Sequence, residues 1–524
     1  MESDEEEKLS ERKTKIKNWL KNPYNLCLVG ILVLAFAIRF YYFLLTKTQP
    51  LWWDEAEYMS IAKSFAGITN FEYHITLNRF PGFPFLASLF YMIGVSNETV
   101  LKFFLAFIPS LITIFLLYFA LSAMYKDKRI ALISTAIFTV LWEHVFYSNR
   151  FHTENWSLIF EFLAIIILFK VYLKKEDWSF IKSKYALLWI VLFILICVLF
   201  RSGNLFIVPI LVLFLVIIHF YKIPEKYRIS AAIGLTGLVI SGYIFMDFLS
   251  RRFAFVNQFY HYESPIYWGV TSVFYGFYQS LVSFIPPVLF YAFLLGVTVV
   301  IGGIAIFPEG LKRINKNVED NSYKADTFNL ILIAGFLFFF IFILRAGGFE
   351  YRWLFALLPG MFAFTAKGLI KFGDFVQSMF KIKYLSIFLI FVFLCLGVYT
   401  QWQHADMIVR NKLDSYQQVK DSGLWIKENS NKSDIIISSS LTQHAYYSGR
   451  RVYNVDWFSS EENFTDFIKN SNPKYLVLSI FQPSSDWAYD WPQRHNETVV
   501  PTQVYFLESS QPALIIYKIN QDSL

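Results

Sequence analysis

Three acidic residues follow the first long apolar run of the chain, in the segment "LWWDEAEY" (51–58), at Asp54, Glu55 and Glu57. The next residues have the apolar spacing of a short amphipathic helix at a membrane surface. One interpretation is structural, because an N-capping Asp and acids in the first turn both stabilise a helix start. The other is chemical, because a carboxylate at a membrane interface can act as a general base. The residues alone leave both open.

A second polar group, "NRFHTEN" (149–155), holds Arg150, His152 and Glu154 just before another apolar run. Arg150 and Glu154 are four positions apart, so they would share a helix face and form an ion pair if the helix started early. Glu161 lies two turns further, inside the apolar run. An acid within a membrane span is either functional or the partner of another buried polar group.

Further arginines stand in the short connections between apolar runs, at Arg79, Arg201, Arg345 and Arg352. The planar guanidinium group matches phosphate oxygens in a bidentate geometry that lysine cannot provide. Any single one of them could cap a carbonyl group or form a local salt bridge. A bound phosphate is the better explanation for the whole set.

A metal site is a weaker alternative. His74, His144, His152 and His261 lie near the same predicted face as the acids. However, no tight pair such as HxxxH is present. A divalent metal is therefore possible, but we assign no metal ligands and no other cofactor.

The composition predicts what must position these residues. The chain is 56% hydrophobic and only 17% charged, with a mean hydropathy of +0.43, which is typical of a polytopic α-helical membrane protein and excludes an ordinary soluble enzyme. A span needs roughly 17–25 apolar residues, which predicts about eleven spans. They cover residues 24–46, 99–124, 129–147, 154–173, 185–200, 203–221, 229–249, 284–307, 327–344, 353–370 and 384–403.

Loop charges predict the orientation, because cytoplasmic loops carry excess Lys and Arg. The strongly basic loops fall on one side only if the short, proline-led run at 82–95 does not span. We therefore expect residues 1–23 to be cytoplasmic and 82–95 to form an interfacial or re-entrant helix on the other side, within a first outer loop at 47–98. The membrane domain then covers residues 24–403.

From residue 404 to 524 the pattern changes to short strands that alternate with helices. This predicts a small soluble α/β domain, which span parity places outside the cytoplasm. Cys27, Cys197 and Cys395 lie far apart in apolar runs and are expected to pack rather than form disulfides. The modest net charge of +7 gives no reason to expect a nucleic-acid partner.

Several of these motifs together resemble the membrane glycosyltransferases of the GT-C superfamily. They are "WWDEAEY" after the first span, "NRFPGFPFL" (78–86), "NRFHTEN" and "EYRWLFALLPG" (350–360). The likeness is greatest to the branch that contains protein O-mannosyltransferases and the aminoarabinose transferases of lipid A. It covers residues 24–173 well and 340–370 moderately.

The resemblance implies a polyprenyl-phosphate sugar donor in the lipid bilayer and inverting transfer to a hydroxyl group of a lipid, glycan or protein at the outer face of the plasma membrane. It implies that Asp54 is the catalytic carboxylate and Glu55 its partner. The substrate-binding residues would be Arg79, Arg150, His152, Glu154, Arg201, Arg345 and Arg352. Two departures matter: Glu154 stands where this branch commonly has aspartate, and the C-terminal part lacks the "WWDYG" motif of an oligosaccharyltransferase.

A transporter or flippase of a lipid-linked anion is the alternative, with the arginines as its substrate path. Such proteins are commonly built from repeated halves with paired broken helices, which this sequence does not display. The long acidic outer loop and the soluble domain favour an enzyme.

Overall fold

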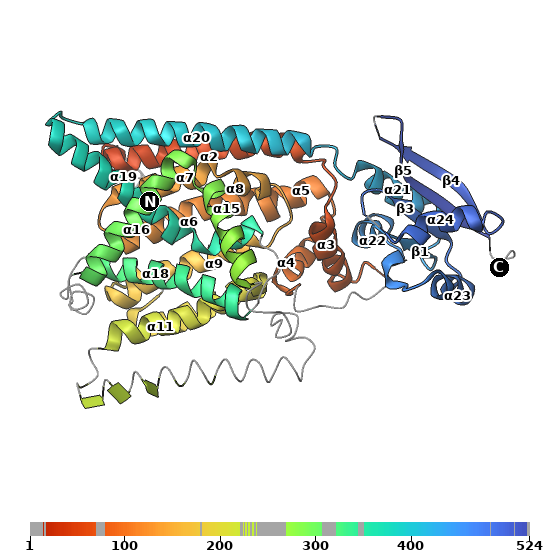
Figure 1. The fold of residues 1–524 in the computed structure, drawn as a ribbon, viewed down its shortest axis with the longest axis horizontal. Helices are drawn as coiled ribbons and strands as arrows, with labels where there is room; N and C mark the ends of the chain where they lie inside the picture. Colours follow the sequence, from red (N-terminus) through yellow and green to blue (C-terminus); the bar gives the residue numbers. More distant parts are fainter. Residues whose placement is uncertain are drawn as a thin grey trace, which may run out of the picture.

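The structure is a computed structural model of the whole chain. It describes residue 14, residues 17–69, 79–178, 181–220, 269–306, 321–343, 350–482, 484–507 and 509–520, and isolated positions between 224 and 241. Figure 1 shows a bundle of long helices, a small helical layer and a C-terminal domain that contains a β-sheet.

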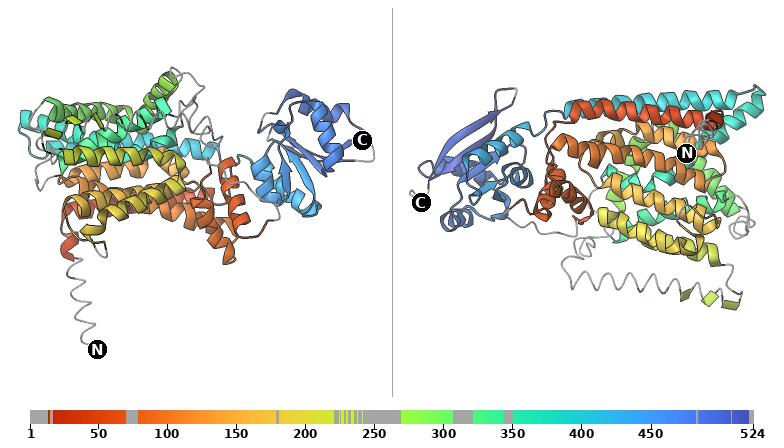
Figure 2. Two further views of the ribbon diagram at one scale, coloured as in Figure 1. Left: turned by 90° about the horizontal axis from the view of Figure 1, so that it is seen from below. Right: turned by 180° about the vertical axis from the view of Figure 1, so that it is seen from behind.

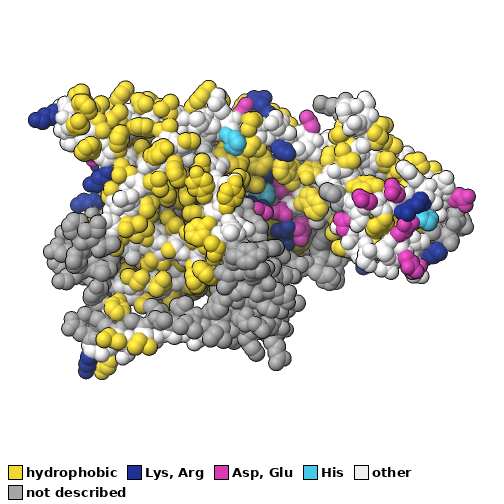
Figure 3. Space-filling model, viewed as in Figure 1, with side chains coloured by type: hydrophobic (Ala, Val, Ile, Leu, Met, Phe, Trp, Pro, Cys, Tyr) yellow, Lys and Arg dark blue, Asp and Glu magenta, His cyan; other side chains and the backbone are white. Residues whose placement is uncertain are grey.

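Long apolar helices build the bundle. Within the described residues, nine helical segments are long and apolar enough to cross a membrane. Their main helices are α2 (Pro23–Thr46), α6 (Ile108–Met124), α9 (Glu154–Ile166), α10 (Ala186–Phe200), α11 (Ile207–His219), α16 (Pro287–Ile301), α18 (Ser322–Phe338), α19 (Leu358–Phe380) and α20 (Leu385–Asn411). Hydrophobic side chains cover the visible face of the bundle in Figure 3, as expected for a lipid-facing surface. The predicted membrane-protein class is thereby confirmed.

One of the eleven predicted spans differs from the described helices, and another cannot be compared with them. The run at 129–147 is split into α7 (Lys128–Val140) and α8 (Trp142–Tyr147), because Leu141 is not helical and the Trp142 amide donates to Gln401 of α20 at 2.9 Å. The run at 229–249 lies largely outside the described residues. The predicted number of eleven is therefore not confirmed.

Two further helices lie between the bundle and the C-terminal domain (Figures 1 and 2). They are α3 (Trp53–Phe65), which carries the acidic segment, and α4 (Gly82–Met92). With 11 residues, α4 is only about 16 Å long, which is too short to span a membrane. A separate core of aromatic and aliphatic side chains joins α3 and α4, and it includes Tyr58, Met59, Phe83 and Tyr91.

The C-terminal domain is a three-layer α/β/α structure. Its sheet has the order β2-β1-β3-β5-β4, in which β1 is parallel to β2 and β3 while β5 is antiparallel to β3 and β4. The strands are β1 (Ile435–Ser438), β2 (Arg451–Tyr453), β3 (Tyr475–Ser479), β4 (Val499–Phe506) and β5 (Pro512–Ile519). One face packs against α21 (Gln417–Asn429) and α22 (Leu441–Ser448), and the other against α23 (Glu461–Ser471) and α24 (Asp486–Arg494).

Alternation along the strands explains this layering, since neighbouring side chains point to opposite faces. Ile436 joins the core under α21 and α22, whereas Ile437 joins the core under α23 and α24. The α/β domain predicted from sequence is confirmed. Helix α20 continues to Asn411, beyond the predicted boundary at 404, so α21 at Gln417 is the first element of the domain.

Glycine allows α16 and α19 to pack with their backbones in contact. A Cβ atom on Gly368 would lie 1.7 Å from the Ala292 carbonyl oxygen, and one on Gly296 would lie 1.8 Å from the Phe364 carbonyl oxygen. Small residues at such crossings let helices approach closely, which is a main source of packing energy inside a membrane.

This contact makes Gly368→Ala a test of the fold. The added methyl group must push the two helices apart, so we expect a loss of about 1–3 kcal/mol or more and a lower melting temperature in detergent. Gly30→Ala in α2 is the matched control, because a Cβ atom there meets no atom within 4 Å. Equal melting temperatures for the two variants would contradict the close packing of α16 and α19.

Candidate active site

Charged side chains from five segments meet at the end of the bundle that faces the C-terminal domain. They come from the start of α3, the segment shortly before α4, the start of α9, the end of α10 and the turn before α19. Figure 3 shows acidic, basic and histidine side chains gathered on this face between the apolar bundle and the domain. Most of the predicted site residues lie in this cluster.

Asp54 is a partly exposed acid that pairs with two arginines of the cluster. Its Oδ1 accepts from the Arg79 guanidinium group at 2.5 Å and its Oδ2 accepts from Arg352 at 2.9 Å. Arg79 also donates through Nε to Glu57 at 2.7 Å. The side chains of Asp54, Arg79 and Arg352 remain 20%, 25% and 19% exposed, so all three groups are partly open to solvent.

Opposing effects set the pKa of Asp54. Burial alone would raise it, but the positive charges of Arg79 and Arg352 outweigh burial and hold the pKa below its ordinary value of 3.8. Asp54 is therefore a carboxylate at neutral pH. The same attraction keeps Arg79 protonated, since Tyr58, Asp54 and Glu57 raise its pKa against the effect of burial.

Glu154 is a second, fully enclosed carboxylate at the first position of α9. Its Oε1 lies 3.3 Å from Arg201 and 3.7 Å from Arg352. Arg201 also donates to the Arg352 carbonyl oxygen at 3.0 Å. Arg352 thus bridges Asp54 and Glu154, and its Nε donates to Glu350 as well. Negative charge at this position also suits the positive end of α9.

His152 completes this group as a neutral ring. Burial lowers its pKa, and the nearby Arg352 lowers it further, although Glu154 acts in the opposite direction. Its Nδ1 faces the Arg352 guanidinium group at 3.2 Å and therefore accepts a hydrogen bond. Tyr147 packs edge-on against the ring, with the centroids 4.6 Å apart.

Glu55 has different neighbours from Asp54, although it is adjacent in sequence. Its side chain is buried, and its oxygens accept from the Trp52 amide at 2.8 Å, the Phe151 amide at 2.8 Å and Arg150 at 3.1 Å. The bond to Trp52 is half of a capping box at the start of α3. Glu55 therefore joins this helix to the segment before α9.

Arg150 pairs with Glu55 rather than with Glu154. The reason is that α9 begins only at Glu154, so the spacing of four residues does not place both on one helix face. Arg150 also donates to Gln49 at 3.0 Å and stacks on the Trp52 ring at 3.7 Å. Burial lowers its pKa, and Glu55 counteracts that effect.

A buried network that the sequence analysis did not single out supports the start of α9. Arg39 of α2 donates to the Thr139 carbonyl at 2.8 Å and contacts His144 at 2.7 Å, and His144 contacts Asn155 at 2.8 Å. The carbonyl groups at the end of α7 stabilise the positive charge. The available sequence signal for this network was an arginine within an apolar run. The structure shows that this arginine is fully buried.

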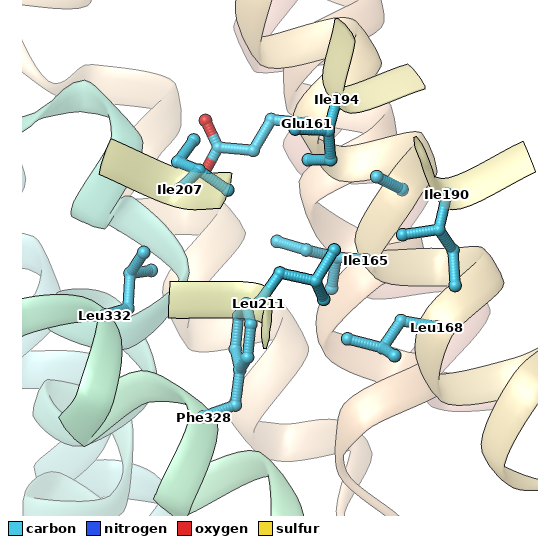
Figure 4. Close-up of a pocket in the computed structure, with 10 residues that line it drawn as sticks. Glu161, Ile165, Leu168, Ile190, Ile194, Ile207, Leu211, Phe328 and Leu332 are labelled. Carbon is cyan, nitrogen blue, oxygen red and sulfur yellow. The ribbon is translucent and has the colours of Figure 1, made fainter. Parts of the chain in front are cut away.

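Glu161 lies apart from the site, in a narrow apolar cavity between α9, α10, α11 and α18 (Figure 4). Isoleucine, leucine and phenylalanine side chains line the rest of this cavity, and the Glu161 carboxyl group lies beside Ile207. Among the described residues, neither of its oxygens has a hydrogen-bond partner, so the expected polar partner is not found there.

Two further predictions concern Arg345 and a metal site. Arg345 lies outside the described residues, as do His74 and His261. Within the part of the chain that the structure describes, no group of three His, Cys, Asp or Glu side chains is placed to hold a metal ion. The acids of the site have arginine partners instead.

Comparison with solved structures identifies the fold. The crystal structure of ArnT from Cupriavidus metallidurans in the apo state aligns over 95% of this chain and 98% of its own, with 12% identity and a TM-score of 0.55. The structure of the same ArnT bound to undecaprenyl phosphate aligns over 94% and 97%, with 13% identity and a TM-score of 0.53. No protein-family model and no curated protein sequence matches. This chain therefore shares the overall fold of these ArnT structures.

The Glu55–Arg150 pair gives a testable stability difference. Glu55→Gln keeps the shape but leaves a buried guanidinium group without its countercharge, which typically costs about 3–5 kcal/mol. We expect a clearly lower melting temperature in detergent. Asp177→Asn, which breaks an exposed pair with Lys182, is the control and should melt like the wild type. A Glu55→Gln variant as stable as this control would contradict a structural ion pair.

Proposed function

We propose that this protein is a membrane glycosyltransferase that moves a sugar from a polyprenyl-phosphate donor to a hydroxyl acceptor. The observation that carries the proposal is the pairing of Asp54, a partly exposed carboxylate, with both Arg79 and Arg352 at one end of the bundle. The fold shared with ArnT supports it, and so does the undecaprenyl phosphate bound to one of those ArnT structures.

In the proposed reaction, the acceptor oxygen attacks the anomeric carbon of the donor sugar from the side opposite the phosphate. Asp54 takes the proton of the acceptor hydroxyl as the new C–O bond forms. The bond between the anomeric carbon and the phosphate oxygen breaks, and its electron pair stays on the polyprenyl phosphate. A single displacement of this kind inverts the configuration at the anomeric carbon.

Arg79 and Arg352 would bind the donor phosphate. The leaving phosphate gains negative charge in the transition state, and preorganised guanidinium groups stabilise that charge. On the other side, one carboxylate oxygen of Glu154 lies 3.7 Å from Arg352 and 3.3 Å from Arg201. Glu154 and Arg201 thereby hold Arg352 in place. Their role, together with that of His152, is to fix the orientation of Arg352.

The same arginines link donor binding to the basicity of Asp54. In the free protein they lower the pKa of Asp54, against the effect of burial. A bound phosphate would neutralise much of their charge. Burial would then dominate and raise the pKa of Asp54, which makes the carboxylate a stronger base when the donor is in place.

We assign a positioning role to Glu55 and Arg150, since both are buried and their polar atoms contact protein groups. We also propose that the N-terminus is cytoplasmic and that the site and the C-terminal domain face the outside of the plasma membrane. The basis is the placement of the basic loops. The acceptor belongs to the class of lipid, glycan or protein hydroxyl groups.

Substitution of the proposed base tests the activity. Asp54→Asn should reduce sugar transfer by about 10²–10⁴-fold, because the acceptor loses its general base. Binding of undecaprenyl phosphate should persist, which a lipid-binding assay on the purified variant measures.

Glu57→Gln is the matched control, because it removes the other acid paired with Arg79 but leaves Asp54 intact. It should retain activity close to that of the wild type. Wild-type transfer by Asp54→Asn would sink the assignment of the base. Movement of a lipid-linked anion across vesicles without sugar transfer would instead favour the transporter.

The pH dependence tests the link between donor and base. The pKa of Asp54 in the free protein lies below 3.8, so kcat/KM should fall only below that pH, where the carboxylate becomes protonated. The acid limb of kcat, which reports the donor complex, should lie at higher pH. Coincident limbs in the two profiles would contradict competition between phosphate and Asp54 for the arginines.

A further inference from the structure

We propose that the C-terminal domain positions the catalytic carboxylate, by holding the peptide that leads into α3. This inference rests on the proposed function of Asp54. It concerns Gln443 and Tyr447, which lie four positions apart on α22 and therefore on one helix face.

Both polar groups of Leu51 are bound by this face. The Leu51 amide donates to the Tyr447 hydroxyl oxygen at 2.7 Å, and the Gln443 side-chain amide donates to the Leu51 carbonyl oxygen at 3.0 Å. Leu51 is fully buried, so no water competes for these groups. A buried backbone group without a hydrogen-bond partner destabilises the protein. These two hydrogen bonds therefore hold the Leu51 peptide in one position.

The following peptide is also fixed, because the Trp52 amide donates to Glu55. Asp54 is then two residues further, in the first turn of α3. Only Trp52, whose amide is bound by Glu55, lies between Leu51 and the first residue of α3. The Asp54 carboxylate is thus positioned by a series of contacts that begins in the C-terminal domain.

Contacts of α22 extend to the far end of α3 and to α4. Lys63, in the last turn of α3, donates to the Tyr446 carbonyl oxygen at 3.0 Å and lies 3.5 Å from the centroid of its ring. The Tyr446 hydroxyl group is 3.4 Å from that of Tyr91 in α4. Tyr446 and Tyr447 also belong to the apolar core that joins these two helices. Helix α22 therefore contacts both α3 and α4, the two helices that lie between the bundle and the C-terminal domain.

The helix that makes these contacts is itself firmly placed. His444 is fully buried between the Ser438 hydroxyl group at 2.6 Å and the Ser422 hydroxyl group at 2.8 Å. Ser438 ends β1 and Ser422 belongs to α21. The position of α22 is therefore set by the sheet and by its neighbouring helix, which gives Gln443 and Tyr447 a rigid base.

The experiment uses Tyr447→Phe and Gln443→Ala in the full chain. Each removes one hydrogen bond to Leu51, and the first keeps the aromatic ring. We expect kcat to fall roughly 10-fold or more through misplacement of the base, with a nearly unchanged KM for the donor. Tyr475→Phe and Gln418→Ala are matched controls, since their hydrogen bonds, to Asn429 and Phe506, lie within the domain.

Hydrogen exchange provides a readout that does not depend on activity. In Tyr447→Phe the Leu51 amide should exchange faster than in the wild type and in Tyr475→Phe, because its acceptor is gone. Melting temperatures similar to those of the controls would show that both variants are folded. Slower turnover, an unchanged donor KM and faster exchange together support the inference.

Two kinetic results would overturn it. The first is a kcat equal to that of the controls while Asp54→Asn is inactive. The second is a change confined to the KM of the acceptor, which would make the domain a selector of acceptors. If the wild-type chain transferred no sugar, the proposed function would fail. Unchanged hydrogen exchange of the Leu51 amide in Tyr447→Phe would separately refute the proposal that α22 holds this peptide.

Discussion

The site depends on the pairing of charges at one end of a mostly apolar helical bundle, with Arg352 between Asp54 and Glu154. Charges removed from water must be compensated, and a buried charge without a partner is strongly destabilising. This requirement draws together α3, α9 and the turn before α19, which are far apart in sequence.

The adjacent acids Asp54 and Glu55 show how position in a helix start divides chemical roles. Glu55 faces inward, closes the capping box and neutralises Arg150, so it stabilises the loop. Asp54 faces the cluster of arginines and stays partly exposed. The initial alternatives, a helix cap and a general base, thus fall on two different residues: Glu55 forms the cap, and Asp54 remains the candidate base.

Much of this arrangement could be predicted from sequence, because membrane insertion imposes strong rules. Apolar length identified most helices, and the placement of arginines between spans indicated one common cluster for Arg79, Arg201 and Arg352. The partners of Arg150 could not be predicted, because they depend on where α9 begins. The roles of Gln443 and Tyr447 left no sequence signal, since a glutamine and a tyrosine on a short helix are ordinary until its docking surface is known.

In the reaction that we propose, Arg79 and Arg352 are shared between Asp54 and the donor phosphate. A structure of the protein with bound undecaprenyl phosphate tests it most directly. We expect phosphate oxygens within about 2.7–3.2 Å of both guanidinium groups, and an Asp54 carboxylate that has lost at least one of its arginine contacts. A phosphate bound elsewhere, with both contacts of Asp54 intact, would contradict it.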